Sequence, residues 1–421
     1  MFMKKWQNKI LLTSWITYAS FYLIRVNMPV AIPGIMKEFH VSKTEIGIVL
    51  SALFAAYAFG QFVNGQLGDK FGAKKIVTFG LLASAILNII FGFTGNFILG
   101  MAIIWGLNGF FQSMGWGPIV KTVANWFQKE KRGRISGILA SAYIAGSAIS
   151  WLLAGYILKY ANWRWVFWFP AILTIGFAIN WFRKITNTCE EAGFPPVEIC
   201  ENDKNKFYKP SIIENAKFVL LNKYIWLAAL SLFGLNIVRY GFIDWAPTYF
   251  FEVQKAQIST AVFKAVIFPL AGILGALFTG WASDKLFKGR RAPMAVIMLI
   301  LLALSAFSFH IVPKENWILS LVLLAITGFL TFGPHMLIVT ALPMDLGTKE
   351  KASSAAGFID GMGYIGASLT GVGTGLLIDY ISWDAAFYFW ISGAIIAAIF
   401  MLILWGYEEK RKKITQGELA A

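Results

Sequence analysis

The stretch from Gly65 to Lys75 reads GQLGDKFGAKK, and the stretch from Gly280 to Arg291 reads GWASDKLFKGRR. Each begins with a glycine, has an aspartate four residues later, and continues to a further glycine and a pair of cations. The two copies start 215 positions apart, and each connects two long apolar runs. A motif repeated at matching positions predicts a chain built from two related halves.

We interpret both stretches as tight hinges that latch one face of the protein and release it. Glycine lets neighbouring helices approach closely, and an aspartate can accept hydrogen bonds from helix ends or pair with a cation. A single copy is equally compatible with an ordinary basic loop, and the second copy favours the latch. The candidate hinge residues are Gly65, Asp69, Gly72, Gly280 and Asp284.

The composition indicates a surface that faces lipid. Of the 421 residues, 57% are hydrophobic and 14% are charged, and the mean hydropathy is +0.63, whereas soluble domains carry about 25% charged residues. The net charge of +15 comes from short basic clusters between apolar runs. Because a nucleic-acid partner requires basic residues gathered on one soluble face, we do not expect one.

Twelve apolar runs are long enough to cross a bilayer, since a helix needs roughly 20 apolar residues to do so. We therefore predict an all-α membrane protein with twelve transmembrane helices in two six-helix bundles. The predicted spans are 11–33, 46–67, 76–96, 98–126, 135–157, 165–182, 224–250, 262–281, 293–313, 317–341, 354–378 and 385–407.

The basic residues predict the orientation. With the N-terminus in the cytoplasm, most lysines and arginines fall in cytoplasmic segments, which is the bias that sets membrane topology. We expect a multi-pass protein of the cell inner membrane with both termini cytoplasmic. The predicted domains are 1–182, a cytoplasmic linker at 183–223, and 224–421 with a basic tail. Cys189 and Cys200 lie in the linker without metal-ligand spacing, and we expect reduced thiols.

Two arginines lie inside apolar runs at equivalent positions of the repeat. Arg239 follows Arg25 by 214 positions, and Pro247 follows Pro33 by the same interval. An arginine at the centre of a membrane helix costs roughly 2.5–3.5 kcal/mol on insertion scales, so it indicates function by default. Guanidinium groups match phosphate or carboxylate oxygens with two parallel hydrogen bonds, and two of them suit a dianion. The alternative is a salt bridge to an acidic residue such as Asp345 or Asp360, or snorkelling.

The first hinge sequence resembles the signature loop of the major facilitator superfamily. The segments YASFYLIRVN (18–27), GWGP (115–118), IVRYGFIDWAPTY (237–249) and AAGFIDGMGYIG (355–366) resemble the organophosphate:inorganic phosphate antiporter family. That family includes glycerol-3-phosphate and hexose-phosphate transporters. The resemblance spans nearly the whole chain. It implies two six-helix bundles, a central site and rocker-switch exchange, with Arg25 and Arg239 gripping phosphate and with Tyr18, Tyr22 and Tyr57 lining the cavity.

Three positions depart from the glycerol-phosphate branch of that family. Val26 and Gln61 replace lysines, and Tyr143 replaces a histidine. The site therefore has fewer positive groups than that branch. This weakens glycerol-3-phosphate as the substrate and leaves sugar phosphates, phosphoglycerate-like acids or another organic anion open.

Two further polar residues inside apolar runs are candidates for the site. His335 either contacts substrate or donates to a backbone carbonyl, and Asp360 neutralises an arginine, binds a substrate hydroxyl or carries a proton. We expect exchange of an organophosphate for inorganic phosphate by a monomer that needs no cofactor. Alternatives are proton-coupled symport of a sugar acid and a membrane sensor for sugar phosphate. No ATP site is visible, since no P-loop appears. An enzyme is disfavoured because no nucleophile–base pair or metal-ligand set is evident.

Overall fold

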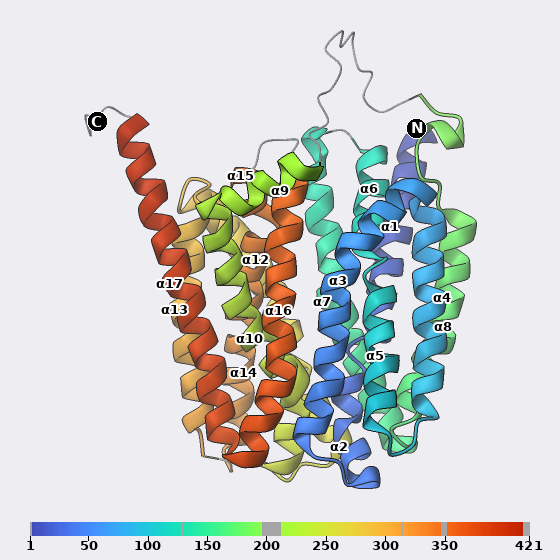
Figure 1. Cartoon of the computed structure of the whole chain (residues 1–421), viewed down its shortest axis with the longest axis vertical. Helices are drawn as coiled ribbons and strands as arrows, with labels where there is room; N and C mark the ends of the chain where they lie inside the picture. Colours follow the sequence, from blue (N-terminus) through green and yellow to red (C-terminus); the bar gives the residue numbers. More distant parts are fainter. Residues whose placement is uncertain (1, 128, 196–211, 314, 347–351, 416–421) are drawn as a thin grey trace. The chain divides into compact units, whose positions relative to one another are not determined.

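The computed structural model describes residues 2–127, 129–195, 212–313, 315–346 and 352–415, and within these ranges the regular structure is helical (Figure 1). Twelve segments of this described part are long and apolar enough to cross a membrane, from Met3–Phe39 to Trp383–Tyr407. The predicted all-α fold with twelve transmembrane helices is therefore confirmed. Many helices extend past the apolar runs from which they were predicted.

The described residues form two compact units. The first comprises Met1–Tyr208 and Ile243–Pro269, and the second comprises Lys209–Phe242 and Leu270–Ala421. The helices of the first unit are α1 (Phe2–Leu23), α2 (Met28–Phe39), α3 (Lys43–Phe71), α4 (Ala73–Gly92), α5 (Ile98–Gln112), α6 (Trp116–Trp126), α7 (Lys129–Tyr160), α8 (Trp165–Lys184), the short 3₁₀ helix Glu190–Ala192 and α11 (Ile258–Ala265).

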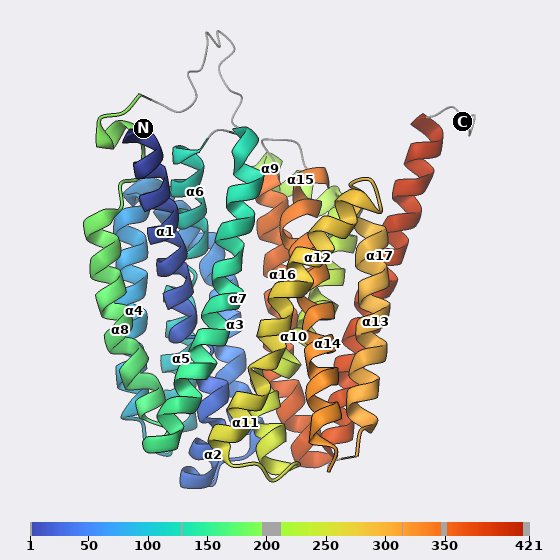
Figure 2. The same ribbon diagram turned by 180° about the vertical axis from the view of Figure 1, so that it is seen from behind.

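The first unit also contains the C-terminal part of α10 (Lys223–Glu252). Its helix α11 packs against α7 and α2, as Figure 2 shows from behind. The Phe263 ring lies 3.1 Å from the position where a Cβ on Gly155 would stand. An ion pair joins Lys43 Nζ at the start of α3 to Glu252 Oε1 at the end of α10, at 3.2 Å. These contacts attach the end of the seventh span and the start of the eighth to the first unit.

The second unit contains the start of α10 and most of α12 (Ile267–Lys285), together with the helices that follow. The helices that follow are α13 (Arg291–Ile311), α14 (Trp317–Met336), the π-helix Leu337–Ala341, α15 (Leu342–Leu346), α16 (Ala352–Tyr380) and α17 (Trp383–Thr415), and α9 (Ile212–Leu221) precedes α10 in the same unit. Aromatic rings form its core: Phe242 lies 5.5 Å from Phe309 and 5.2 Å from Trp390, between ring centroids. The Trp390 indole donates to Thr374 Oγ1 at 2.9 Å, which satisfies its polar atom inside the apolar core.

Local sequence explains where several helices begin. Ser42 caps α3 by accepting from the Glu45 backbone N–H at 3.2 Å, while the Glu45 side chain accepts from the Ser42 backbone N–H at 2.8 Å. This reciprocal pair satisfies two amide groups that would have no partner within the helix. Pro29 lies in the first turn of α2, where its missing N–H is not needed.

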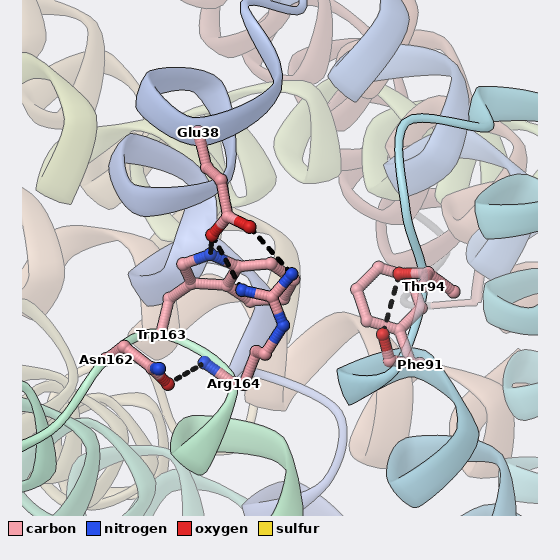
Figure 3. Close-up of polar contacts among 6 residues, drawn as sticks. All are labelled: Glu38, Phe91, Thr94, Asn162, Trp163 and Arg164. Carbon is pink, nitrogen blue, oxygen red and sulfur yellow. Dashed lines mark hydrogen bonds and ion pairs between the residues drawn. The ribbon is translucent and has the colours of Figure 1, made fainter.

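An ion pair that the sequence did not predict joins two helix ends of the first unit (Figure 3). Arg164, which precedes α8, donates from Nη1 to Glu38 Oε2 at 2.6 Å and from Nη2 to Oε1 at 2.7 Å. The Trp163 indole donates to Glu38 Oε2 at 2.8 Å, and the Arg164 guanidinium lies 4.5 Å from the Trp163 ring centroid. The bidentate geometry fixes the end of α2 against the start of α8.

We expect Glu38→Gln to lower the stability of the folded protein by about 1 kcal/mol, because one charge-assisted bond is lost from a partly exposed pair. Thermal unfolding in detergent measures this, and the difference should shrink at high salt. Lys37→Gln is the control, since it also removes one charge, at an exposed neighbouring position. An equal loss in both variants would show that the ion pair contributes nothing specific.

Candidate functional site

The first membrane span is broken at Arg25. We predicted one continuous helix over 11–33, but α1 ends at Leu23, residues 24–27 form turns, and α2 starts at Met28. The backbone N–H groups of Arg25 and Val26 both point to the Tyr22 carbonyl, at 3.3 and 3.2 Å. A break of this kind exposes carbonyls that a continuous helix would satisfy, so they need other partners inside the membrane.

Buried side chains from three neighbouring helices supply those partners, and we call them the carbonyl cage. The members are Asn88 of α4, Asn108 and Gln112 of α5, and Trp151 of α7. Their bonds are Asn88 Nδ2 to Ile24 O (3.1 Å), Asn108 Nδ2 to Ile24 O (3.0 Å), Gln112 Nε2 to Phe21 O (3.1 Å) and Ile24 O (3.4 Å), and Trp151 Nε1 to Val26 O (2.8 Å). The cage therefore makes the break a defined structure.

Within the break, the Arg25 side chain is 4% exposed. Its Nε donates to Gln112 Oε1 at 3.1 Å, and its Nη1 donates to the Tyr22 hydroxyl at 3.3 Å. The guanidinium carbon lies 4.7 Å from the Tyr22 ring centroid and 4.4 Å from that of Tyr57. Aromatic faces attract a guanidinium, and this attraction strengthens where water is excluded.

The other predicted tyrosines of the first half pack next to Tyr22, one of the residues in contact with Arg25. The Tyr18 and Tyr22 ring centroids are 5.8 Å apart, and those of Tyr22 and Tyr143 are 6.1 Å apart. Gln61 lies one turn after Tyr57 on α3 and is half-buried. The structure thus brings Tyr18, Tyr22, Tyr57 and Tyr143 together around Arg25, and places Gln61 on the helix that carries Tyr57.

Arg239 has a comparable environment in the second unit, but α10 is unbroken around it. The side chain is 3% exposed. Its Nη1 lies 3.1 Å from His335 Nε2. Because a guanidinium has no acceptor, the imidazole nitrogen accepts in this contact. The guanidinium also lies 4.9 Å from the Tyr240 ring centroid and 5.1 Å from that of Phe332.

His335 lies in the last turn of α14, and the π-helix Leu337–Ala341 starts two residues later. Single π turns inside longer helices occur frequently at functional sites. Asp360 is half-buried on α16, one turn before Tyr364, and the Tyr364 ring centroid lies 6.4 Å from that of Tyr240. His335 therefore contacts Arg239 directly. Asp360 shares helix α16 with Tyr364, whose ring lies near the ring of Tyr240, and Tyr240 in turn lies beside the Arg239 guanidinium.

The two predicted hinge loops differ in detail. Gly72 joins α3 to α4 with φ of +82°, a conformation that other residues adopt only with strain. In the second loop, Asp284 Oδ1 accepts from Arg291 Nη1 at 2.6 Å, so this aspartate pairs with a cation as expected. Gly280 lies in α12. Gly65 and Asp69 lie in α3, and the Asp69 side chain is outside the described residues.

The segment 185–195, at the start of the predicted linker, folds onto the first unit and covers its first hinge. Asn187 Oδ1 accepts from the Lys74 backbone N–H at 2.9 Å. The Trp126 indole donates to the Thr186 carbonyl at 3.0 Å, and the Trp6 ring stacks on Trp126 with centroids 5.7 Å apart. Figures 1 and 2 both show the N-terminal end of α1 beside this segment. We call residues 185–195 the strap.

The strap buries the thiol of Cys189, which we expect to be unreactive while the strap is docked. Its burial, with a smaller effect of the Glu190 carboxylate, raises the pKa of this thiol to about 11. The reactive thiolate is then about a thousandth or less of the population at pH 7.5. In a Cys200→Ser background, maleimide labelling at pH 7.5 should therefore be slow.

Asn187→Ala removes one of the side-chain contacts that hold the strap, so this variant should label faster than the Cys200→Ser parent. Glu190→Gln is the control, because it alters the neighbouring charge without touching Asn187. Rapid labelling of the parent, at the rate of an exposed thiol, would contradict the docked strap.

Sequence reasoning missed the residues that hold Arg25 in place. Asn88, Asn108 and Gln112 are polar residues within apolar runs, and each is fully buried. A polar side chain inside a membrane segment is itself a signal of function. That signal was available, although it does not identify the carbonyls that these amides reach.

Comparisons with known proteins agree with this architecture. The family model of the Major Facilitator Superfamily matches residues 10–371. The "Glycerol-3-phosphate transporter" of Bacillus subtilis (strain 168) is 33% identical, over 98% of this chain and 95% of that protein. The "Membrane sensor protein UhpC" of Salmonella typhimurium (strain LT2) is 31% identical, over 94% of this chain and 90% of that protein.

A solved structure shows the same fold at low sequence identity. The crystal structure of a bacterial homolog to the human lysosomal transporter Spinster matches with a TM-score of 0.76 at 13% identity, covering 95% of each chain. The family model and the relatives at more than 30% identity extend over most of the sequence. This protein is therefore a member of the major facilitator superfamily, not an enzyme, and is related to the organophosphate transporters of that superfamily.

Proposed function

We propose that this protein is a secondary active transporter that exchanges an organophosphate for inorganic phosphate by alternating access. The observation that carries the proposal is the pair of buried arginines, Arg25 and Arg239, which the internal repeat relates. Each guanidinium lies against aromatic faces and donates to an uncharged acceptor, Gln112 or His335. These contacts orient the two guanidinium groups.

The substrate in this proposal is a dianion. A phosphate monoester carries about −1.5 to −2 charges near neutral pH, which matches one positive charge from each arginine. The guanidinium groups keep their charge at any physiological pH and present paired donors to phosphate oxygens. Glycerol phosphate, sugar phosphates and phosphoglycerate-like anions all meet this requirement, with Tyr18, Tyr22, Tyr57, Gln61, Tyr143 and Asp360 as further candidate contacts.

The same electrostatics favours exchange over one-way transport. Two cations within membrane helices are costly when no anion is bound. A bound dianion offsets that cost, so the loaded transporter changes conformation more easily than the empty one. Import of an organophosphate is then coupled to export of inorganic phosphate. The hinge residues Gly65, Asp69, Gly72, Gly280 and Asp284 would accompany this change.

In this proposal the transporter acts as a monomer in the cell inner membrane, with both termini in the cytoplasm. The clusters of lysine and arginine support the orientation, and the bacterial relatives support the location. The 1–182 and 224–421 halves would each supply one arginine, and the 183–223 segment would link them.

Counterflow in proteoliposomes tests the proposal. Vesicles containing the purified protein are loaded with unlabelled phosphate and offered labelled phosphate, glycerol phosphate or hexose phosphate, with and without an imposed proton gradient. We expect rapid exchange of labelled phosphate that needs phosphate inside and no proton gradient. Uptake that requires the proton gradient and no internal anion would replace this proposal with proton-coupled symport of an organic anion.

The similarity to a membrane sensor favours one second candidate, a receptor that binds a phosphorylated ligand and signals to a partner. The same preparation distinguishes the two functions. Binding of phosphate or hexose phosphate, measured by a shift in thermal unfolding, together with exchange no faster than in protein-free vesicles, would favour the sensor.

A further inference from the structure

The amide of Gln112 connects the Arg25 guanidinium to the backbone on both sides of the helix break. Gln112 is the last residue of α5 and is fully buried. Its Oε1 accepts from Arg25 Nε at 3.1 Å, while its Nε2 donates to the Phe21 carbonyl at 3.1 Å and the Ile24 carbonyl at 3.4 Å. One side chain therefore holds both the charged group and the main chain that carries it.

The chemistry of these partners allows only one orientation of the amide. A guanidinium N–H can only donate, and backbone carbonyls can only accept. The oxygen of Gln112 must therefore face Arg25, and its NH₂ group must face the carbonyls. A flipped amide would lose all three bonds inside a buried site. The orientation of the Gln112 side chain is thus determined by its surroundings.

We propose that Gln112 is a positioning residue that aims Arg25 at the transported anion. Gln112 accepts from Nε and the Tyr22 hydroxyl accepts from Nη1, so these two bonds set the direction in which the guanidinium points. The Tyr22 and Tyr57 ring centroids lie 4.7 and 4.4 Å from the guanidinium carbon, and these contacts further restrict its rotation. The inference rests on the proposed role of Arg25 in anion binding, and it adds the group that sets the direction of that arginine.

Arg239 is held in a different way. It stands on the unbroken helix α10, and its Nη1 lies 3.1 Å from Nε2 of His335 on α14. Gln112 instead bonds both to the Arg25 side chain and to backbone carbonyls at the helix break. Loss of Gln112 should therefore affect anion binding through Arg25 beyond any effect on folding.

Asn108 provides a matched control on the same helix. It lies one turn before Gln112, is fully buried, and donates to the same Ile24 carbonyl at 3.0 Å. Its side-chain bond is to that backbone oxygen and not to Arg25. Asn108→Leu and Gln112→Leu thus each remove one buried amide from the carbonyl cage, and only Gln112→Leu removes the bond to the guanidinium.

The first experiment measures binding of inorganic phosphate to the full-length protein in detergent, together with the melting temperature. A hydrogen bond to a charged group is worth about a tenfold change in affinity or more. We expect Gln112→Leu to weaken phosphate binding about tenfold or more, and Asn108→Leu to weaken it by less than about threefold. The two variants should lose a similar amount of melting temperature. Equal weakening in the two variants would overturn the inference.

The second experiment reports on Arg25 without any anion. The protein is labelled with ¹⁵Nε-arginine, and the Arg25 resonance is identified by its absence in Arg25→Lys. We expect this resonance to shift in Gln112→Leu and to keep its position in Asn108→Leu. If Gln112→Leu does not accumulate, Gln112→Met, which keeps the length of the side chain, takes its place. An unshifted resonance in the Gln112 variant would also overturn the inference.

The two readouts separate this inference from the proposed function. If wild-type protein binds no phosphate but the Arg25 resonance shifts only in the Gln112 variant, the anion proposal fails and the positioning of Arg25 stands. If phosphate binds and the resonance does not depend on Gln112, the proposed function stands and the positioning role fails.

Discussion

Replacing Arg25 by lysine is expected to abolish phosphate exchange, with a loss of at least about a hundredfold in initial rate. Lysine keeps the positive charge but has no planar fork, so it cannot give two parallel hydrogen bonds to a phosphate group. It also loses the Nε bond to Gln112 and the contacts with the Tyr22 and Tyr57 rings. The measurement is counterflow of labelled phosphate in vesicles that contain equal amounts of folded protein.

The same result is expected for Arg239→Lys, because the repeat assigns the second arginine an equivalent role. Arg183→Lys is the control, since it makes the identical chemical change at an exposed position at the end of α8. Exchange in Arg25→Lys at a rate close to that of Arg183→Lys would mean that phosphate does not depend on the guanidinium geometry, and the proposed site would be wrong.

Gly109→Ala is expected to lower the free energy of unfolding by about 3 kcal/mol, because the added methyl group would overlap the backbone of the neighbouring helix. A Cβ at this position would collide with the Leu53 carbonyl oxygen and lie 2.8 Å from the Leu53 carbonyl carbon. Backbone atoms cannot rotate away as a side chain can, so α3 and α5 would have to separate. Thermal unfolding and the yield of folded protein from membranes measure this effect.

Gly106→Ala is the control on the same face of α5. Its Cβ would lie 3.5 Å from the Ala52 carbonyl oxygen, which is an ordinary contact. This variant should be neutral or slightly more stable, because alanine is favoured over glycine inside a helix by roughly 0.5–1 kcal/mol. A similar loss of stability in both variants would indicate that the close approach at Gly109 is not what makes glycine necessary there.

The fold was predictable because the signals that specify it are local or repeated. A run of about 20 apolar residues must become a spanning helix in lipid, where every backbone group needs a partner. The two copies of the hinge sequence then predicted duplicated halves. The prediction was wrong where helix 11–33 was taken as continuous, because the break at residues 24–27 depends on amide donors that come from other helices.

The candidate site was predictable only in part. Arg25 and Arg239 were found because a charge inside an apolar run is unusual in any sequence, and the tyrosines followed from the resemblance to a known family. The contact between Arg239 and His335 joins residues 96 positions apart. The strap at 185–195 was interpreted as a polar linker, because its composition does not reveal that Asn187 caps the N-terminus of α4.

The sequence by itself therefore predicted that this chain crosses the membrane twelve times, that its halves are related, and that each half buries one arginine. These features follow from hydropathy, from repetition and from the cost of placing a charge in lipid, all of which can be evaluated along the chain. Only the tertiary structure decided how Arg25 is held. Gln112 reaches the Phe21 carbonyl from 91 positions away, and that contact exists because α5 packs beside a broken first span with its last residue turned toward the break.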